Sequence, residues 1–154
     1  MLAKINEESV VNASRQFWEQ MLSMRVEALP SHEESGLLAG HMLGSVALSG
    51  VWKGRIEVRM AIGLAYAATA AMLMQQVDSV VEADALDATK ELANMIAGVI
   101  KSSLPRPCTM TVPESAIEAE TFEKCNDCAD CLDVSFRHAS GEFLVRVQEQ
   151  ECVA

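Results

Sequence analysis

Two stretches of this chain alternate strictly between polar and apolar residues, and they constrain the fold more than any other feature. Residues 55–60 read Arg-Ile-Glu-Val-Arg-Met, and residues 132–148 repeat the pattern on both sides of a Gly-containing turn. Successive side chains of a strand point to opposite faces of a sheet, so this period predicts half-buried strands in two antiparallel hairpins, over 36–60 and 132–148. The polar residues of the first run should then lie in water. They are Arg55, Glu57 and Arg59.

Three helices are predicted from the helical period and from residues that start or stop helices. Residues 6–24 form an amphipathic pattern, and residues 63–75, rich in Ala and Met, indicate a helix buried nearly all round. A third helix begins at Asp84, a suitable N-cap, and ends before Pro105, because the residue before proline avoids the helical conformation. The apolar stripe of the first helix includes Val10, Phe17 and Met21.

The remaining segments complete a fold of the α+β class. Residues 108–112 indicate a short strand, and residues 114–130 an acidic loop that could hold a turn of helix. Residues 30–36 form a polar linker. Strands grouped into hairpins predict a mainly antiparallel sheet with the helices packed on one face, an α/β sandwich.

Composition limits the classes of function. The chain has 154 residues, enough for one domain spanning 1–154 with a sizeable core. Its net charge of −10, with the 12 Lys and Arg scattered, argues against a nucleic-acid partner. No apolar run reaches the roughly 18 residues that a membrane span needs. Glu7 and Glu8 stand where a signal peptide has a basic region, so we expect a soluble, cytoplasmic protein.

The third helix carries polar residues on the face opposite its apolar stripe. At about 100° per residue, Asp87, Glu91, Asn94 and Gly98 fall within about 60° of each other, with Lys101 beside them. Solvated helices carry Glu, Lys and Asn routinely, and Asp87 could serve only the helix start, as a capping-box partner of the N-cap. Asn and Gly are nevertheless poor helix formers, and a sequence chosen for stability alone would avoid them in mid-helix.

The run from Glu91 to Gly98, preceded by Asp87 in the pattern Asp-x3-Glu-x2-Asn, resembles the signature of the CheC/CheX/FliY family. Members of this family are phosphatases of the phosphorylated chemotaxis response regulator CheY. With one such motif in a short chain, the sequence is most similar to CheX. Residues 11–22, 48–54 and 141–143 are also similar to CheX-type chains, which implies a CheC-like sandwich and a homodimer.

The resemblance implies a role for each residue of this face. Asn94 would orient the water that attacks an aspartyl phosphate, and Glu91 would pair with the active-site lysine of the CheY-like receiver domain. Gly98 would allow close approach of the partner, with Asp87 and Lys101 also in the contact. The chain itself would bind no cofactor, since the receiver supplies Mg²⁺. The alternatives are a proton-abstracting role for Glu91 and a module that binds a receiver or another signalling partner without turnover.

The cysteines allow a further reading. Five cysteines in a cytoplasmic chain favour free thiols over a disulfide framework. Cys125, Cys128 and Cys131 could instead hold Zn²⁺ if Cys108 or His138 completed a tetrahedron. Structural zinc sites usually pair two Cys-x-x-Cys units, and here there is one compact run, so free thiols in an exposed loop are the default. A metal- or redox-responsive regulator is accordingly the third hypothesis.

Overall fold

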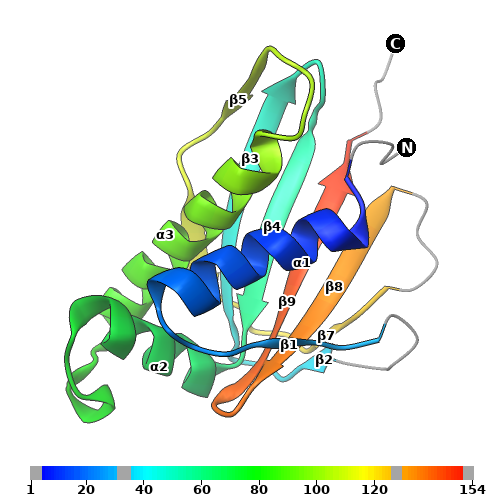
Figure 1. Ribbon diagram of the computed structural model, residues 1–154. Helices are drawn as coiled ribbons and strands as arrows, with labels where there is room; N and C mark the ends of the chain where they lie inside the picture. Colours follow the sequence, from blue (N-terminus) through cyan, green and yellow to red (C-terminus); the bar gives the residue numbers. More distant parts are fainter. Residues whose placement is uncertain (1–4, 31–35, 126–129, 151–154) are drawn as a thin grey trace.

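Two antiparallel hairpins form the centre of the sheet (Figure 1). The computed structural model describes residues 5–30, 36–125 and 130–150. The two hairpins are joined side by side, because β4 pairs with β9 from Gly54 opposite Glu149 to Met60 opposite Phe143. Both predicted hairpins are confirmed. Their strands are β3 (Met42–Gly50), β4 (Gly54–Met60), β8 (Cys131–His138) and β9 (Gly141–Glu149).

Shorter strands extend this sheet on both sides, in the order β1-β8-β9-β4-β3-β5, with β6 also paired to β3. The predicted strand from Cys108 is confirmed, although it ends at Met110. The acidic stretch 114–130 holds two strands where we predicted a loop with a possible turn of helix, and that prediction was wrong. The added strands are β1 (Glu27–Ala28), β5 (Cys108–Met110), β6 (Glu114–Ile117) and the separate pair β2 (Gly36–Leu37) and β7 (Phe122–Glu123).

The three helices lie on one face of the sheet, as Figure 1 shows for α1 and α3, so the predicted α+β sandwich is confirmed. The helices bury their apolar sides against the inward-facing residues of the hairpins. Val134, Val145 and Val147 are at most 1 % exposed, as their alternation predicted. The helices are α1 (Glu7–Arg15), α2 (Ile62–Leu73) and α3 (Glu82–Lys101).

The first helix changes geometry along its length. Asn6 caps α1, because its side-chain oxygen accepts a hydrogen bond from the Ser9 backbone N–H at 2.9 Å. From Gln16 to Met21 the chain continues as a wider π-helical segment. Trp18 is fully buried there and its ring stacks on Phe143, with 4.8 Å between centroids. Met21 is 58 % exposed, so its placement on the buried stripe was wrong: the wider turns rotate it away from the 3.6-residue register.

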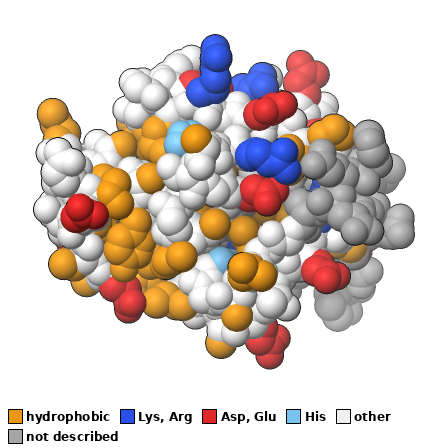
Figure 2. All heavy atoms as spheres, turned by 90° about the horizontal axis from the view of Figure 1, so that it is seen from below, with side chains coloured by type: hydrophobic (Ala, Val, Ile, Leu, Met, Phe, Trp, Pro, Cys, Tyr) orange, Lys and Arg blue, Asp and Glu red, His pale blue; other side chains and the backbone are white. Residues whose placement is uncertain are grey.

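The second helix is buried on one side only. Leu64, Ala65 and Ala68 face the core, whereas Leu73 is half exposed and Met74, just past the helix end, is 93 % exposed. Our prediction of burial nearly all round was therefore wrong. Figure 2 shows hydrophobic side chains gathered on the left of the lower face, the side on which α2 ends. No helix among the described residues is both long and apolar enough to cross a bilayer.

The face of the sheet opposite the helices is covered, which the alternation did not predict. Glu57 and Arg59 of β4 are each only 9 % exposed, so their predicted exposure was wrong, while Arg55 is exposed as expected. The cover is β7, whose Phe122 ring lies 4.1 Å from the guanidinium carbon of Arg59 and 4.5 Å from that of Arg146. Two guanidinium groups thus hold one aromatic ring over the sheet.

Candidate functional site

The helix α3 carries the predicted site, and its N-cap, Val81, lies three residues before the predicted one. Val81 is the extended residue before the first turn, and Asp84 lies within that turn, so the prediction of Asp84 as N-cap was wrong. A carboxylate there still favours the helix, since the first turn is the positive end of its dipole. Asp87 lies one turn later, with a side chain 76 % exposed and 3.9 Å from the Lys90 ammonium. It is therefore outside any capping box.

The buried side of α3 lies close against the first hairpin. A Cβ atom on Gly44 of β3 would stand 2.7 Å from the Thr89 carbonyl oxygen and 3.0 Å from Ala93 Cβ, so the absence of a side chain lets helix and strand touch. The Thr89 hydroxyl donates a hydrogen bond to the Ala85 carbonyl at 2.7 Å and is thus satisfied within the core. The full buried stripe is Ala85, Thr89, Leu92, Ala93, Ile96, Ala97 and Ile100.

The opposite side of α3 carries the residues singled out from the sequence. Glu91 is exposed, and Asn94, Gly98 and Lys101 are partly exposed. Within the described parts of the chain, no hydrogen bond or ion pair engages the side chains of Glu91 or Asn94. A Cβ atom on Gly98 would meet nothing within 4 Å. The helical period thus brings all of these residues to one open surface, which we call the motif face: Asp87, Glu91, Asn94, Gly98 and Lys101.

Two side chains of the motif face, Asn94 and Glu91, have no hydrogen bond or ion pair within the described residues and can therefore bind another molecule. Asn94 has both a hydrogen-bond donor and an acceptor, carries no charge, and does not titrate. Glu91, one turn earlier, offers a carboxylate that can pair with a cation of another molecule. Neither side chain lines any of the larger cavities found among the described residues, so nothing there encloses a small substrate. The arrangement therefore suits chemistry in which a second macromolecule brings its own reacting group.

The sequence analysis did not identify Arg106, which lies next to the motif face. A cleft of about 520 Å³ begins at Gly98 and Lys101 and is also lined by Arg106 and Pro107. Arg106 is exposed and lies in the turn between α3 and β5. Its placement depends on the path of that turn, which helical periodicity does not describe. The nearest signal was the position of an arginine between two prolines directly after the helix.

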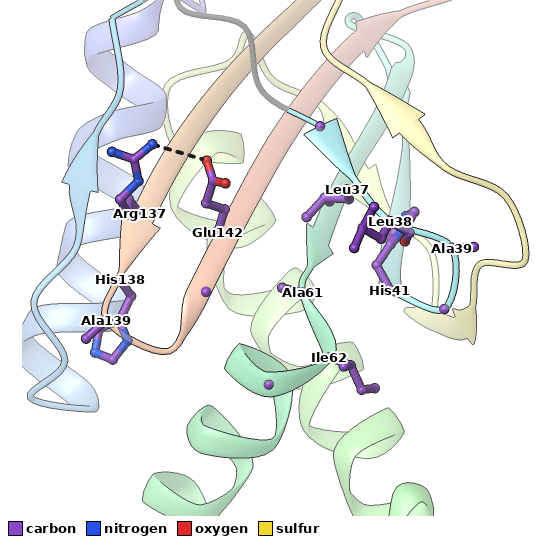
Figure 3. Close-up of a pocket in the computed structure, with 14 residues that line it drawn as sticks. Leu37, Leu38, Ala39, His41, Ala61, Ile62, Arg137, His138, Ala139 and Glu142 are labelled. Atoms are coloured by element: carbon purple, nitrogen blue, oxygen red, sulfur yellow. Dashed lines mark hydrogen bonds and ion pairs between the residues drawn. The ribbon is translucent and has the colours of Figure 1, made fainter.

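A second cavity, of about 470 Å³, lies between α2 and the β8–β9 hairpin (Figure 3). Arg137 and Glu142 form an ion pair of 3.7 Å at its wall. His41 is buried below it, with Nδ1 against the Leu38 carbonyl and Nε2 against Arg59. Among the described residues that line it, none carries a hydroxyl, thiol or carboxamide, and none belongs to α3. This cavity therefore lacks the groups on which the motif-face chemistry depends.

The cysteine loop is described in part. Cys125 is disulfide-bonded, so the expectation of free thiols was wrong there, while Cys108 and Cys131 are free. Burial, together with Asp133, raises the pKa of the Cys131 thiol from its ordinary value of 9.0 to about 11. In the described ranges no three potential ligand side chains gather as a metal would require. Cys128 lies outside them, and the zinc alternative stays untested.

Asp133 is the centre of a charged group on the covered face. Its two carboxylate oxygens each accept a hydrogen bond of 2.7 Å from Arg146, and one of them accepts a further bond from the Cys125 backbone N–H at 2.8 Å. The hydrogen bond with Asp133 raises the pKa of Arg146 further above its usual range. This group joins β8, β9 and the loop before β8, and its role is structural.

Comparisons with known proteins agree with this architecture. Similar solved structures include CheX from Vibrio vulnificus, with a TM-score of 0.73, 16 % identity, and coverage of 94 % of this chain and 95 % of that one. CheX from Desulfovibrio desulfuricans gives 0.72, 19 % identity, and coverage of 93 % and 97 %. A chain of the CheX–CheY–BeF₃–Mg²⁺ complex from Borrelia burgdorferi gives 0.69, 18 % identity, and coverage of 96 % and 99 %. At these identities the likeness shows the fold alone.

Comparison of the sequence with family models assigns the family. No curated protein sequence matches the chain significantly. A family model described as chemotaxis phosphatase CheX matches residues 42–135, from the first strand of the first hairpin to the middle of β8, and thus all of α3. That match spans more than half of the 154 residues. The chain therefore belongs to the CheX family of chemotaxis phosphatases.

Proposed function

We propose that this protein accelerates hydrolysis of the aspartyl phosphate on a CheY-like receiver domain. The observation that carries the proposal is the motif face, where the exposed Glu91 and the partly exposed Asn94 stand one turn apart, with no side-chain partners among the described residues. Membership of the CheX family and the Borrelia burgdorferi complex of CheX with CheY support a partner of this class.

The reaction needs positioning more than acid–base chemistry. An acyl phosphate is already activated, and the receiver's own Mg²⁺ neutralises the phosphoryl oxygens, so a helper must hold a water in line with the breaking bond. A carboxamide suits this because it hydrogen-bonds without charge beside a dianion, whereas a carboxylate would be repelled. We assign this part to Asn94, whose side chain projects from a helix seated firmly on β3.

Glu91 is assigned to docking. It would pair with the receiver's active-site lysine and fix the register in which the phosphoryl group meets Asn94. The alternative for Glu91 is proton abstraction from the water. The two roles differ in pH dependence. If Glu91 only docks the receiver, the rate at saturating protein is independent of pH over the range in which a carboxylate titrates. If Glu91 is a general base, that rate falls as the pH is lowered through this range.

The test is phosphate release from a phosphorylated receiver with wild-type protein and Asn94→Ala. We expect the variant to lower the rate at saturation about 100-fold, as loss of a positioned reactant does, while keeping affinity. Asn12→Ala is the matched control, because Asn12 is an exposed asparagine on α1, and it should leave the rate unchanged. Full activity of Asn94→Ala would reject the assignment.

A second candidate is a binding module that docks a receiver without turnover. It uses the same exposed pair, with Asn94 too far from the phosphoryl group to help. Wild-type protein that binds a phosphorylated receiver yet leaves its intrinsic dephosphorylation rate unchanged would favour this reading. Screening a panel of receiver domains separates this outcome from the use of the wrong partner.

We also propose that the protein acts in the cytoplasm as a homodimer. Strands β5 and β6 both pair with β3 at one edge of the sheet, and the outer side of an edge strand carries backbone groups to which a second copy can bind. Light scattering after size exclusion gives the mass in solution, and a single mass near 16.7 kDa at micromolar concentration would contradict the dimer.

A further inference from the structure

The cleft beyond Gly98 is built differently from the rest of the motif face. Gly98 and Lys101 of α3, with the C-cap residue Ser102, line one part of it, and Arg106 in the following turn and Thr109 of β5 line another. Its volume of about 520 Å³ could accommodate several side chains of a partner. The cleft is therefore a recess at one end of a surface that is otherwise a convex helix.

The charged residues that line the cleft, Lys101 and Arg106, are both cations. Neither forms an ion pair with any residue in the described ranges, although the chain carries a net charge of −10. A lysine in the last turn of a helix is explained by the helix dipole alone. That explanation does not extend to Arg106, which lies five residues past the end of α3, after the buried Leu104.

The position of the cleft ties it to the site. Gly98 lines the cleft and lies four residues after Asn94, a distance of about 6 Å along a helix axis. A stable protein interface covers about 800 Å² on each partner, which is a disc about 16 Å in radius. A partner whose phosphoryl group meets Asn94 would therefore cover the cleft as well.

Charge changes sign along the motif face. Asp87 and Glu91 lie on the N-terminal side of Asn94, and Lys101 and Arg106 lie on its C-terminal side. A partner with a lysine at one end and an acidic side chain at the other fits in one direction only, because the reversed pose opposes like charges at both ends. Arg106 suits a carboxylate well, since a guanidinium can donate two parallel hydrogen bonds to it.

We propose that this cleft receives an acidic side chain of the phosphorylated receiver, held by Arg106 with Lys101 beside it. The inference rests on the proposed function, and it adds a positioning residue that selects the partner and its orientation. Arg106 takes no part in the chemistry. Its removal should therefore raise the Michaelis constant and leave the rate at saturation unchanged.

The test measures binding and turnover separately for wild type, Arg106→Gln and Arg106→Glu. Binding is measured with a receiver treated with BeF₃⁻ and Mg²⁺, which cannot turn over, at 50 and 200 mM salt. We expect Arg106→Gln to raise Kd and KM three- to tenfold and to weaken the salt dependence, and Arg106→Glu to raise both more than tenfold. The matched control is Arg15→Gln, an exposed cation on α1, which should change neither.

The outcomes separate this inference from the function on which it rests. If Arg106→Gln binds like wild type while wild type releases phosphate, the cleft assignment is overturned and the proposed function stands. A fall in the saturated rate with unchanged Kd would also overturn it, because Arg106 would then act in the chemistry. A third outcome is that wild type binds a receiver without accelerating its dephosphorylation, and that the Arg106 variants bind the same receiver more weakly. This would support the cleft assignment and reject the phosphatase activity. A wild type that neither binds nor dephosphorylates any receiver rejects both.

Discussion

Replacing Gly98 with alanine should stabilise the protein and impair its function, and the two effects can be measured apart. Glycine inside a helix costs about 0.5–1 kcal/mol relative to alanine. A Cβ atom at this position meets nothing within 4 Å in the chain itself, so no clash offsets that gain. For a domain of this size, the gain corresponds to a rise of about 1–4 °C in Tm.

The loss of function follows from the close approach that Gly98 is proposed to allow. If the partner's backbone lies against the helix there, an added methyl group overpacks the interface by about 1–3 kcal/mol. This lowers kcat/KM by roughly 5- to 150-fold, at 1.4 kcal/mol per factor of ten. Thermal melting followed by circular dichroism measures the first effect, and phosphate release from a phosphorylated receiver measures the second.

The control for this experiment is Asn12→Ala, which exchanges a poor helix former for a good one on the exposed side of α1. It should raise Tm by a comparable amount and leave kcat/KM at the wild-type value, which excludes an effect of stability alone. A Gly98→Ala protein with raised Tm and wild-type kcat/KM would refute the close approach. A lowered Tm would refute the exposure of Gly98 itself.

Three further substitutions or conditions test the structure. Gly44→Ala should destabilise the protein by about 1–3 kcal/mol in urea unfolding and lower activity, because its Cβ would stand 2.7 Å from the Thr89 carbonyl and push α3 off the sheet; unchanged stability would contradict the packing. Asp133→Ala should cost about 3–5 kcal/mol, since it leaves the guanidinium of Arg146 uncompensated on a covered face; a cost below 1 kcal/mol would contradict that burial. Because the pKa of Cys131 is raised to about 11, its thiol should react with iodoacetamide more slowly than an ordinary thiol near pH 9, and the stability it contributes should fall as pH rises from about 9 through 11. Fast alkylation at pH 8, followed by mass spectrometry, would contradict the shift.

Sequence periodicity predicts those parts of the fold in which the burial of a side chain follows from its position within one helix or strand. The strands around 55–60 and 132–148 alternate because each lies on one core, and α3 follows the helical period because one side packs on β3. The exposure of Glu91 opposite the buried Leu92 and Ile96 needed nothing beyond that period.

The errors arose where a distant segment or a local irregularity decides. Alternation shows that Glu57 and Arg59 share a face, but not that Phe122, more than 60 residues later, returns to cover it. The π-helical segment that turns Met21 outward has no composition of its own. Arg106 was not predicted as part of the site because its position depends on the path of the chain after α3, which brings it back to Gly98.

The aromatic ring that β7 lays over the sheet bears on how quickly a phosphorylated signal could be erased. Phe122 packs against Arg59 of β4 and Arg146 of β9, and α3 touches the other face at Gly44, so this part of the sheet is packed from both sides. A misplacement of 1 Å can cost a catalyst about 100-fold, so a preorganised platform avoids that penalty and needs no rearrangement at encounter. The lifetime of the signal would then be set by how often the two proteins meet in the right orientation.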